Sequence, residues 1–157
     1  MRRPKDSVAA TTPHVAGDED IGEIRGILGF HLRLAHGAVY RHFTESFADL
    51  ELTQKQVSAL WLIGDHPGIA QTDLAQRMRM DRATTMAIVN RLEARRYLLR
   101  GKSASDARKQ TLNLTEAGRK AMVVARQAVR EHEKWLKSRF SDAEVAQLIE
   151  MLTRIHQ

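Results

Sequence analysis

The amino-acid sequence predicts a mainly α-helical fold, a winged helix-turn-helix with additional helices at both ends. Three observations support this prediction. Apolar residues recur every three or four positions over long stretches after position 20, which places them on one face of a helix. Two short helical segments within 71–96 are separated by a turn at Met80 and Asp81, as in a helix-turn-helix. Two short apolar runs then enclose a polar, cationic stretch, the pattern of a β-hairpin.

The N-terminal part is predicted to contain an arm and a long helix. Residues 1–20 are mostly small and polar, end in acidic residues and lack the apolar region of a signal peptide, so we expect a flexible arm. From Ile21 to Phe43 the apolar spacing predicts one long amphipathic helix. Thr53 and Gln56 then have the spacing of a capping box, which predicts a second helix over 54–65.

The helix-turn-helix is predicted from the next two segments. A third helix is expected over 71–78, and Asp81 is the expected N-cap of a fourth helix that begins at Arg82. The apolar positions of both helices share one face and would form a small core: Leu74, Ala75, Met78, Ile88 and Leu92.

The remaining chain predicts a hairpin and two helices. The hairpin loop is expected at 101–108. Thr115 would cap a fifth helix that runs to about Arg139, and Ser141 with Glu144 forms a second capping box for a last helix to Ile155.

The outer helices carry more apolar surface than a small winged core can bury. We therefore expect residues 21–50 and 116–157 to join two copies in a homodimer, with residues 53–115 forming the winged helix-turn-helix and residues 21–157 one domain. A compact monomer is the alternative.

The positive charge of the chain is concentrated in one segment. The net charge is +6, and residues 77–109 contain ten basic and three acidic residues, so this segment alone accounts for the excess. Such a positive field suits a polyanion, nucleic acid or an anionic membrane, although an arginine-rich solvated helix face is the simpler explanation.

Several function classes are disfavoured by what the sequence lacks. The chain has no cysteine, which excludes thiol catalysis, disulfides and cysteine-type zinc sites. No P-loop, Gly-x-Ser-x-Gly or His-Glu-x-x-His motif is present, so an enzyme is the least favoured class, and no cofactor is expected. No stretch approaches the ~18 apolar residues of a membrane span, so we expect a cytoplasmic protein.

The fourth helix is the expected DNA reader. Its core side takes Thr85, Ile88 and Leu92, so the opposite face would enter the major groove, while the start of the third helix would hold the DNA backbone. The alternative for each position is an ordinary surface residue. The candidates on these two helices are Gln71, Thr72, Arg82, Ala83, Thr84, Met86, Ala87, Asn90 and Arg91.

The hairpin tip is the second candidate contact. A slender cationic loop can enter the minor groove, where negative potential attracts arginine. The candidates there are Lys102, Ser103, Asp106, Arg108 and Lys109. Asp106 would be repelled by phosphate, so we expect it to brace Arg108, Arg82 or Arg100 by a charge-assisted hydrogen bond. A plain Asx turn in a solvated loop is the alternative.

These residues carry a resemblance to a known family. The stretch from Leu74 to Gly118 resembles the winged helix-turn-helix of the MarR family of bacterial transcriptional regulators, whose wing pattern is matched by Asp106, Arg108, Leu114, Thr115 and Gly118. The resemblance implies a homodimer joined through the first and last two helices, a pseudopalindromic operator, and usually repression that a small ligand relieves. It also implies that Arg108 enters the minor groove and that Asp106 orients the wing.

Two positions depart from the family pattern. Ala87 stands where many members have a polar or basic reader, so the resemblance does not imply a polar base contact at this position. Arg96 replaces the usual glycine after the fourth helix, so the helix is expected to end without a residue that readily adopts the left-handed conformation.

The resemblance also implies an effector pocket lined by the first, second and fifth helices. The candidates at that location are Phe30, His31, Arg33, Leu34, Arg41, His42, Phe43 and Trp61. Aromatic rings with cationic donors suit an aromatic carboxylate. The first helix also resembles regulators of hydroxycinnamate and other aromatic-acid catabolism, so the effector would be the free acid or its coenzyme A thioester. For Phe43 and Trp61 the alternative is a purely structural role in the core.

Two further hypotheses compete with an effector-responsive regulator. An architectural or nonspecific DNA-binding protein would explain the basic segment without any effector. Metal sensing is disfavoured, because His31, His36 and His42 are five and six residues apart rather than the three or four that bring two ligands together on a helix.

Overall fold

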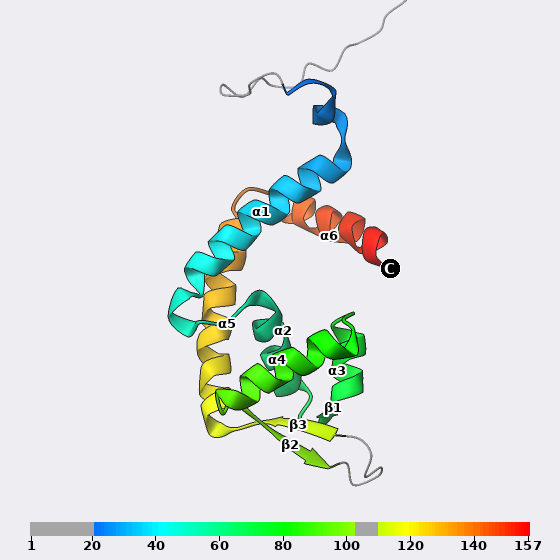
Figure 1. Ribbon diagram of the computed structural model, residues 1–157. Helices are drawn as coiled ribbons and strands as arrows, with labels where there is room; N and C mark the ends of the chain where they lie inside the picture. Colours follow the sequence, from blue (N-terminus) through cyan, green and yellow to red (C-terminus); the bar gives the residue numbers. More distant parts are fainter. Residues whose placement is uncertain (1–20, 103–109) are drawn as a thin grey trace, which may run out of the picture. The chain divides into compact units, whose positions relative to one another are not determined.

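The computed structural model describes residues 21–102 and 110–157. The predicted N-terminal arm and the predicted wing residues Ser103, Asp106, Arg108 and Lys109 lie outside the described residues. The chain divides into two units, residues 1–37 and 38–157, and each is described by itself. Figure 1 labels the helices and strands.

The N-terminal helix begins later than predicted. A short 3-10 helix, η1 (Gly22–Gly26), is followed by α1 (Leu28–Ser46). Ile27 between them is extended, with φ −92° and ψ 111°, so the expected continuous helix from Ile21 is wrong. Glycine disfavours a helix through its conformational freedom, and Gly22 adopts a left-handed φ of 68° at the start of η1.

The second unit holds the remaining helices. They are η2 (Ala48–Leu50), α2 (Gln54–Asp65), α3 (Gln71–Arg77), α4 (Arg82–Ala94), α5 (Glu116–Lys137) and α6 (Asp142–His156). Of these, α2, α4, α5 and α6 start at the predicted caps. Both capping boxes are present: Thr53 pairs reciprocally with Gln56, and Ser141 with Glu144. Asp81 and Thr115 cap α4 and α5 as expected. None of the described helices is long and apolar enough to cross a membrane.

The hairpin is part of a three-stranded antiparallel sheet. Its strands are β1 (Ile69–Ala70), β2 (Leu98–Lys102) and β3 (Gln110–Leu114), in the order β1-β3-β2. Gly101 pairs with Thr111, and Lys102 with Gln110, so the strand extends two residues into the predicted loop. The strand β1 was not predicted, because a two-residue strand has no periodicity of its own.

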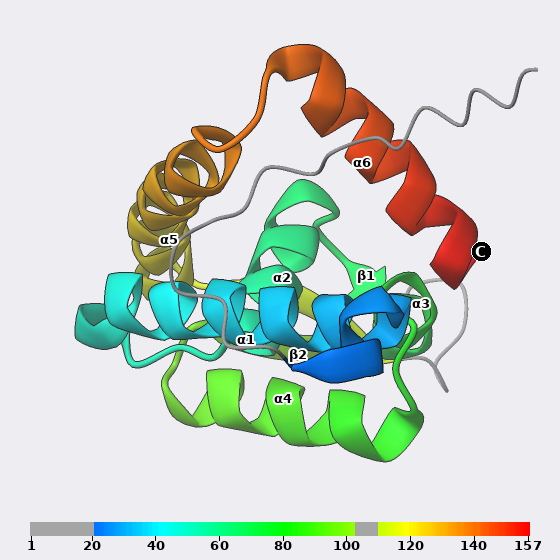
Figure 2. The same cartoon turned by 90° about the horizontal axis from the view of Figure 1, so that it is seen from above.

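The core of the second unit is built around α2. Figure 2 shows α2 at the centre of this unit, with α5 on one side and α3 and α4 around the other. Four of the five predicted core residues of the helix-turn-helix are buried, and Met78 is half-buried against them. Val89, Leu98 and Leu112 are also fully buried, so the wing and the fourth helix share one core.

The fourth helix ends on Arg96 in the left-handed conformation, with φ 59°. The amide of Arg96 donates to Glu93 O at 2.7 Å, and the amide of Tyr97 donates to Leu92 O at 2.9 Å. This pair of hydrogen bonds is a Schellman motif, which glycine normally closes. The helix therefore closes in the usual geometry, with an arginine in the residue position that favours glycine.

Candidate nucleic-acid interface and effector pocket

The fourth helix exposes nearly all the residues predicted to read DNA. Thr85, Ile88, Val89 and Leu92 are buried, which leaves the opposite face of α4 in solvent. The exposed candidates are Arg82, Ala83, Met86, Ala87, Asn90 and Arg91, and Thr84 is half-buried. The predicted face of the helix is thus the solvent face.

Thr84 takes part in the helix cap. Its amide donates to Asp81 Oδ1 at 2.8 Å, and its hydroxyl donates to Asp81 Oδ2 at 2.6 Å. These two hydrogen bonds favour the carboxylate and hold the pKa of Asp81 below its ordinary value. The hydroxyl proton of Thr84 is therefore committed to the cap, and only its oxygen lone pairs remain for DNA.

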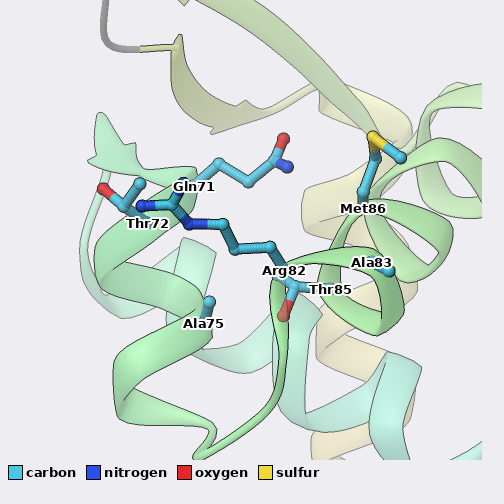
Figure 3. A pocket seen from close by; sticks show the side chains of 7 residues that line it. All are labelled: Gln71, Thr72, Ala75, Arg82, Ala83, Thr85 and Met86. Carbon is cyan, nitrogen blue, oxygen red and sulfur yellow. The ribbon is translucent and has the colours of Figure 1, made fainter.

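A pocket of about 410 Å³ lies between α3 and α4, and we call it the α3–α4 pocket. Its lining residues are Gln71, Thr72, Ala75, Arg82, Ala83, Thr85 and Met86. Figure 3 shows the side chain of Arg82 reaching from α4 toward Thr72 and Gln71 on α3. Gln71 Oε1 is buried and has no hydrogen-bond partner among the described residues. The residues of α3 that were predicted to contact the DNA backbone thus line the same pocket as residues of α4 that were predicted to read the bases.

The arginines of the basic segment are not equivalent. Arg95 donates to Glu51 O at 2.7 Å and to Leu50 O at 3.0 Å, so it ties α4 to the loop before α2. Arg82 and Arg91 are exposed and have no ion-pair partner among the residues that the structure describes. Part of the positive charge is therefore structural, and part is available to a polyanion.

The base of the wing contacts the fourth helix through Arg100. Its two terminal nitrogens donate to Glu93 Oε2 and to Asn90 Oδ1. Asp106 was one predicted partner of Arg100, and these two partners on α4 were not predicted. Lys102 is exposed at the end of β2, and the other wing candidates lie outside the described residues, so their roles remain predictions.

A second pocket, of about 360 Å³, is lined by α1, α2 and α5, the three helices that the family resemblance implied. Its lining residues are Val39, Phe43, Gln54, Ser58, Trp61, Val129, His132, Glu133 and Leu136. The structure thus brings the predicted Phe43 and Trp61 together in one wall. We call this the α1–α2–α5 pocket; His132 and Glu133 were missed by the sequence analysis.

His132 is a buried side chain in the wall of this pocket. It is 5% exposed, and its Nδ1 lies 2.8 Å from Nδ1 of His42, so one ring donates to the other. Burial, and secondarily the neighbouring His42, hold the pKa of His132 below its ordinary value. Trp135 stacks on His42 with 3.8 Å between ring centroids. The predicted candidate His42 therefore reaches the pocket through His132.

Phe43 and Trp61 belong to both the core and the pocket. Phe43 is 4% exposed and stacks on Phe47, while Trp61 is half-buried and carries the guanidinium of Arg126 at 4.7 Å from its ring centroid. Arg126 also pairs with Asp65. Arg126 is thus a cation near the pocket wall that the sequence analysis did not name.

The other effector candidates are divided between the two units, and each is described within its own unit. Phe30, His31, Arg33 and Leu34 belong to the unit 1–37. Within that unit His31 Nε2 lies 2.6 Å from Arg25 O, and Arg33 lies 5.2 Å from the ring centroid of Phe30. Arg41, in the second unit, is exposed. Among the described residues no group of three or more His, Cys, Asp and Glu could hold a metal ion.

Comparison with known proteins identifies the family. The model of the MarR family matches residues 49–109. A "Putative transcriptional regulatory protein for hcr operon" from Thauera aromatica is 34% identical over 137 residues, which cover 87% of this chain and 82% of the relative. The repressor CouR bound to a 23-mer DNA duplex has a TM-score of 0.83 and 31% identity, with 90% of this chain and 100% of that chain covered.

CouR bound to p-coumaroyl-CoA gives a similar result, with a TM-score of 0.79, 30% identity, and 87% of this chain and 96% of that chain covered. The relatives and the solved structures are transcriptional regulators, and the family model covers the helix-turn-helix and the first strand of the wing, β2. This chain belongs to the MarR family of transcriptional regulators.

Proposed function

We propose that this chain is a cytoplasmic homodimeric repressor, which binds a pseudopalindromic operator and is released from it by a small aromatic carboxylate or its coenzyme A thioester. The observation that carries the proposal is that one unit contains both the α3–α4 pocket, which gathers the predicted DNA contacts, and the α1–α2–α5 pocket, which has aromatic walls. The similarity to CouR, which has been solved with DNA and with p-coumaroyl-CoA, points the same way.

The exposed face of α4 supports operator binding. Its side chains combine hydrogen-bonding groups, such as Asn90, with apolar groups, such as Met86, that can contact a thymine methyl. Arg82 and Arg91 add positive charge on the same helix. In the proposal Gln71 and Thr72 contact the DNA backbone, and Lys102, Ser103, Asp106, Arg108 and Lys109 form the minor-groove contact or its support.

The apolar surface of the last two helices supports a homodimer. On α6, Ile149 is 57% exposed and Ile155 is 61% exposed, and on α5, Val123 is 64% exposed. Large aliphatic side chains exposed along successive helices are typical of a surface that another chain covers. We therefore retain residues 21–50 and 116–157 as the proposed dimerisation segments around the winged helix-turn-helix of residues 53–115.

The size and chemistry of the α1–α2–α5 pocket support a one-ring acid as the part of the effector held inside. Its volume lies within the range of ~300–1,000 Å³ that small-molecule sites occupy. Trp61 and Phe43 offer rings for stacking, and His132 can hydrogen-bond a phenol or a carboxyl group. The charge of Glu133 is offset by Lys137 at 3.1 Å, which reduces its repulsion of an acid.

Release of DNA requires a difference in affinity between two arrangements of the protein. An effector shifts the equilibrium only if it binds the DNA-incompetent arrangement more tightly than the competent one. Because α5 packs on α2, and α2 packs on α4, a change in the α1–α2–α5 pocket can alter the position of the recognition helix.

Operator selection followed by effector titration tests the proposal. The protein is first used to select duplexes from a random pool, and a palindromic preference is expected. Anisotropy of the labelled duplex is then followed during titration with 4-hydroxycinnamate and with its coenzyme A thioester. A variant with a filled pocket, Ser58→Phe, should keep DNA affinity and lose the response. Uniform affinity for all duplexes with a steep salt dependence would instead favour the architectural DNA-binding protein.

A further inference from the structure

One arginine of the wing is held by two residues of the recognition helix. Arg100 lies in β2, where its backbone pairs with Leu112 of the central strand. Its side chain is 24% exposed and donates to Glu93 through one terminal nitrogen and to Asn90 through the other. Since both partners lie on α4, the guanidinium fixes the base of the wing to that helix.

The chemistry of the guanidinium determines which way the amide of Asn90 faces. Arginine has only hydrogen-bond donors, so the Asn90 atom that meets it must be the carbonyl oxygen Oδ1. The amide nitrogen Nδ2, with its two donors, is therefore turned away from Arg100. The terminal torsion of an asparagine is broad and roughly two-fold, so without this contact the amide could also adopt the reversed orientation.

Asn90 belongs to the exposed face of α4. Arg82, Met86 and Asn90 are spaced by four residues, which places them along one side of the helix, and all three are exposed. Asn90 is therefore available to DNA through the part of its amide that Arg100 does not hold.

We propose that Arg100 is a positioning residue that turns the Nδ2 donors of Asn90 toward DNA, so that this point of the helix reads a hydrogen-bond acceptor. The acceptors in the major groove are purine N7, guanine O6 and thymine O4, whereas cytosine offers only its N4 donor there. The inference rests on the proposed operator binding and deepens it, because it states the chemistry that one residue recognises.

Glu93 completes the arrangement. Its carboxylate holds the second nitrogen of Arg100 and keeps the guanidinium directed at α4 rather than outward to a phosphate. Arg100 lies in the most basic segment of the chain, yet in this arrangement it acts through Asn90 and does not contact DNA itself. A lysine at position 100 would keep the charge but could not span both partners, since its donors lie on a single nitrogen.

The test measures base preference rather than overall affinity. With an operator selected by the wild-type protein, Kd is measured at fixed salt for all four base pairs at each position. The base pair at which Asn90→Ala loses its preference identifies the contact. Arg100→Met and Arg100→Lys are both expected to reduce discrimination at that same base pair roughly tenfold, and to leave the other positions unchanged. In the double variant with Asn90→Ala, Arg100→Met should cause no further loss there.

Two matched variants separate positioning from folding. Glu93→Gln keeps an acceptor for Arg100, so discrimination should fall less than in Arg100→Met. Asn90→Asp keeps the acceptor for Arg100 and replaces the outward donors by an acceptor, so it should lose the preference for an acceptor base even if Arg100→Met fails to fold. Thermal melting of each variant reports whether the fold is intact.

Three results would overturn the inference. Arg100→Met could weaken all duplexes equally and reduce the salt dependence, which is the signature of a phosphate contact. It could change a base pair other than the one read by Asn90, or Asn90→Asp could retain the original preference. A wild-type protein that selects no preferred duplex is a distinct result, since it refutes operator binding before any variant is compared.

Discussion

Gly118 is the position at which the fold leaves no room for a side chain. It is the third residue of α5, and a Cβ placed on it would lie 1.8 Å from the carbonyl oxygen of Tyr97 and 2.8 Å from the carbonyl carbon. Both atoms belong to the backbone that connects α4 to β2, so no rotamer change can move them away. The start of α5 therefore packs directly on the beginning of the wing.

The cost of Gly118→Ala follows from the contacts around Tyr97. An ordinary contact begins at 3.4 Å, so the two segments must separate by about 1.6 Å. This separation disrupts the hydrogen bond from the amide of Thr115 to Tyr97 O, at 3.0 Å, and that from the Thr115 hydroxyl to Arg96 O, at 2.6 Å.

Each lost hydrogen bond costs ~1 kcal/mol, and overpacking costs ~1–3 kcal/mol. Replacing glycine by alanine within a helix gains ~1 kcal/mol. The expected net loss is therefore ~2–4 kcal/mol, a large part of the ~5–15 kcal/mol that stabilises an ordinary domain.

The measurement is urea denaturation followed by far-ultraviolet circular dichroism at one fixed protein concentration. Gly64→Ala is the matched control, because its Cβ would meet the flexible end of Met122, with Sδ at 2.2 Å, which can rotate away. We expect that control to stay within ~1 kcal/mol of the parent. Equal losses in the two variants, or an unchanged Gly118→Ala, would show that the contact with Tyr97 does not restrict this position.

Three further predictions concern other parts of the chain. Arg96→Gly should raise the unfolding free energy by ~0.5–1 kcal/mol, because glycine avoids the ~1–2 kcal/mol cost of a left-handed residue but loses more entropy on folding; urea denaturation checks this, and a loss would contradict it. The pKa of His132 is lowered from 6.5, so the folded state resists protonation and stability should fall as pH drops below ~6.5 toward the lower folded value; denaturation at about pH 7.5 and about pH 5.5 should give a smaller difference in His132→Phe than in the parent. Arg108→Ala should weaken operator binding by ~1–3 kcal/mol in anisotropy titrations, and unchanged affinity in a folded protein would remove Arg108 from the interface.

The parts of the fold that were predictable depend on neighbouring residues. Asp81 caps α4 and Ser141 pairs with Glu144 because each contact joins residues three apart, and such spacing can be read from the sequence. The buried side of α4 followed from its period in the same way. Ile27 is the local exception, since apolar spacing continues across it while the backbone does not.

The parts that were missed depend on residues distant in the chain. Ile69 is in a strand because it pairs with Leu112, and His132 lines a pocket because α5 packs on α2. His132 also contacts His42, ninety positions away. The hydrogen bond from Arg100 to Asn90 joins strand β2 to helix α4, and no spacing of residues in the sequence predicts it. The recognition face was thus predictable, whereas the contacts that orient its side chains required the folded chain.

The arginines that follow α3 and α4 have a backbone conformation that destabilises the fold and a charge that attracts a polyanion. Arg79, with φ 50°, and Arg96, with φ 59°, are exposed residues in conformations that favour glycine, and both lie in the basic segment. A glycine at either position relieves the backbone whatever the ionic strength, but removes a charge whose attraction for a polyanion is screened beyond ~10 Å at 0.1 M salt. Such a replacement is therefore expected to give a more stable protein at every ionic strength, and slower association with DNA only at low ionic strength.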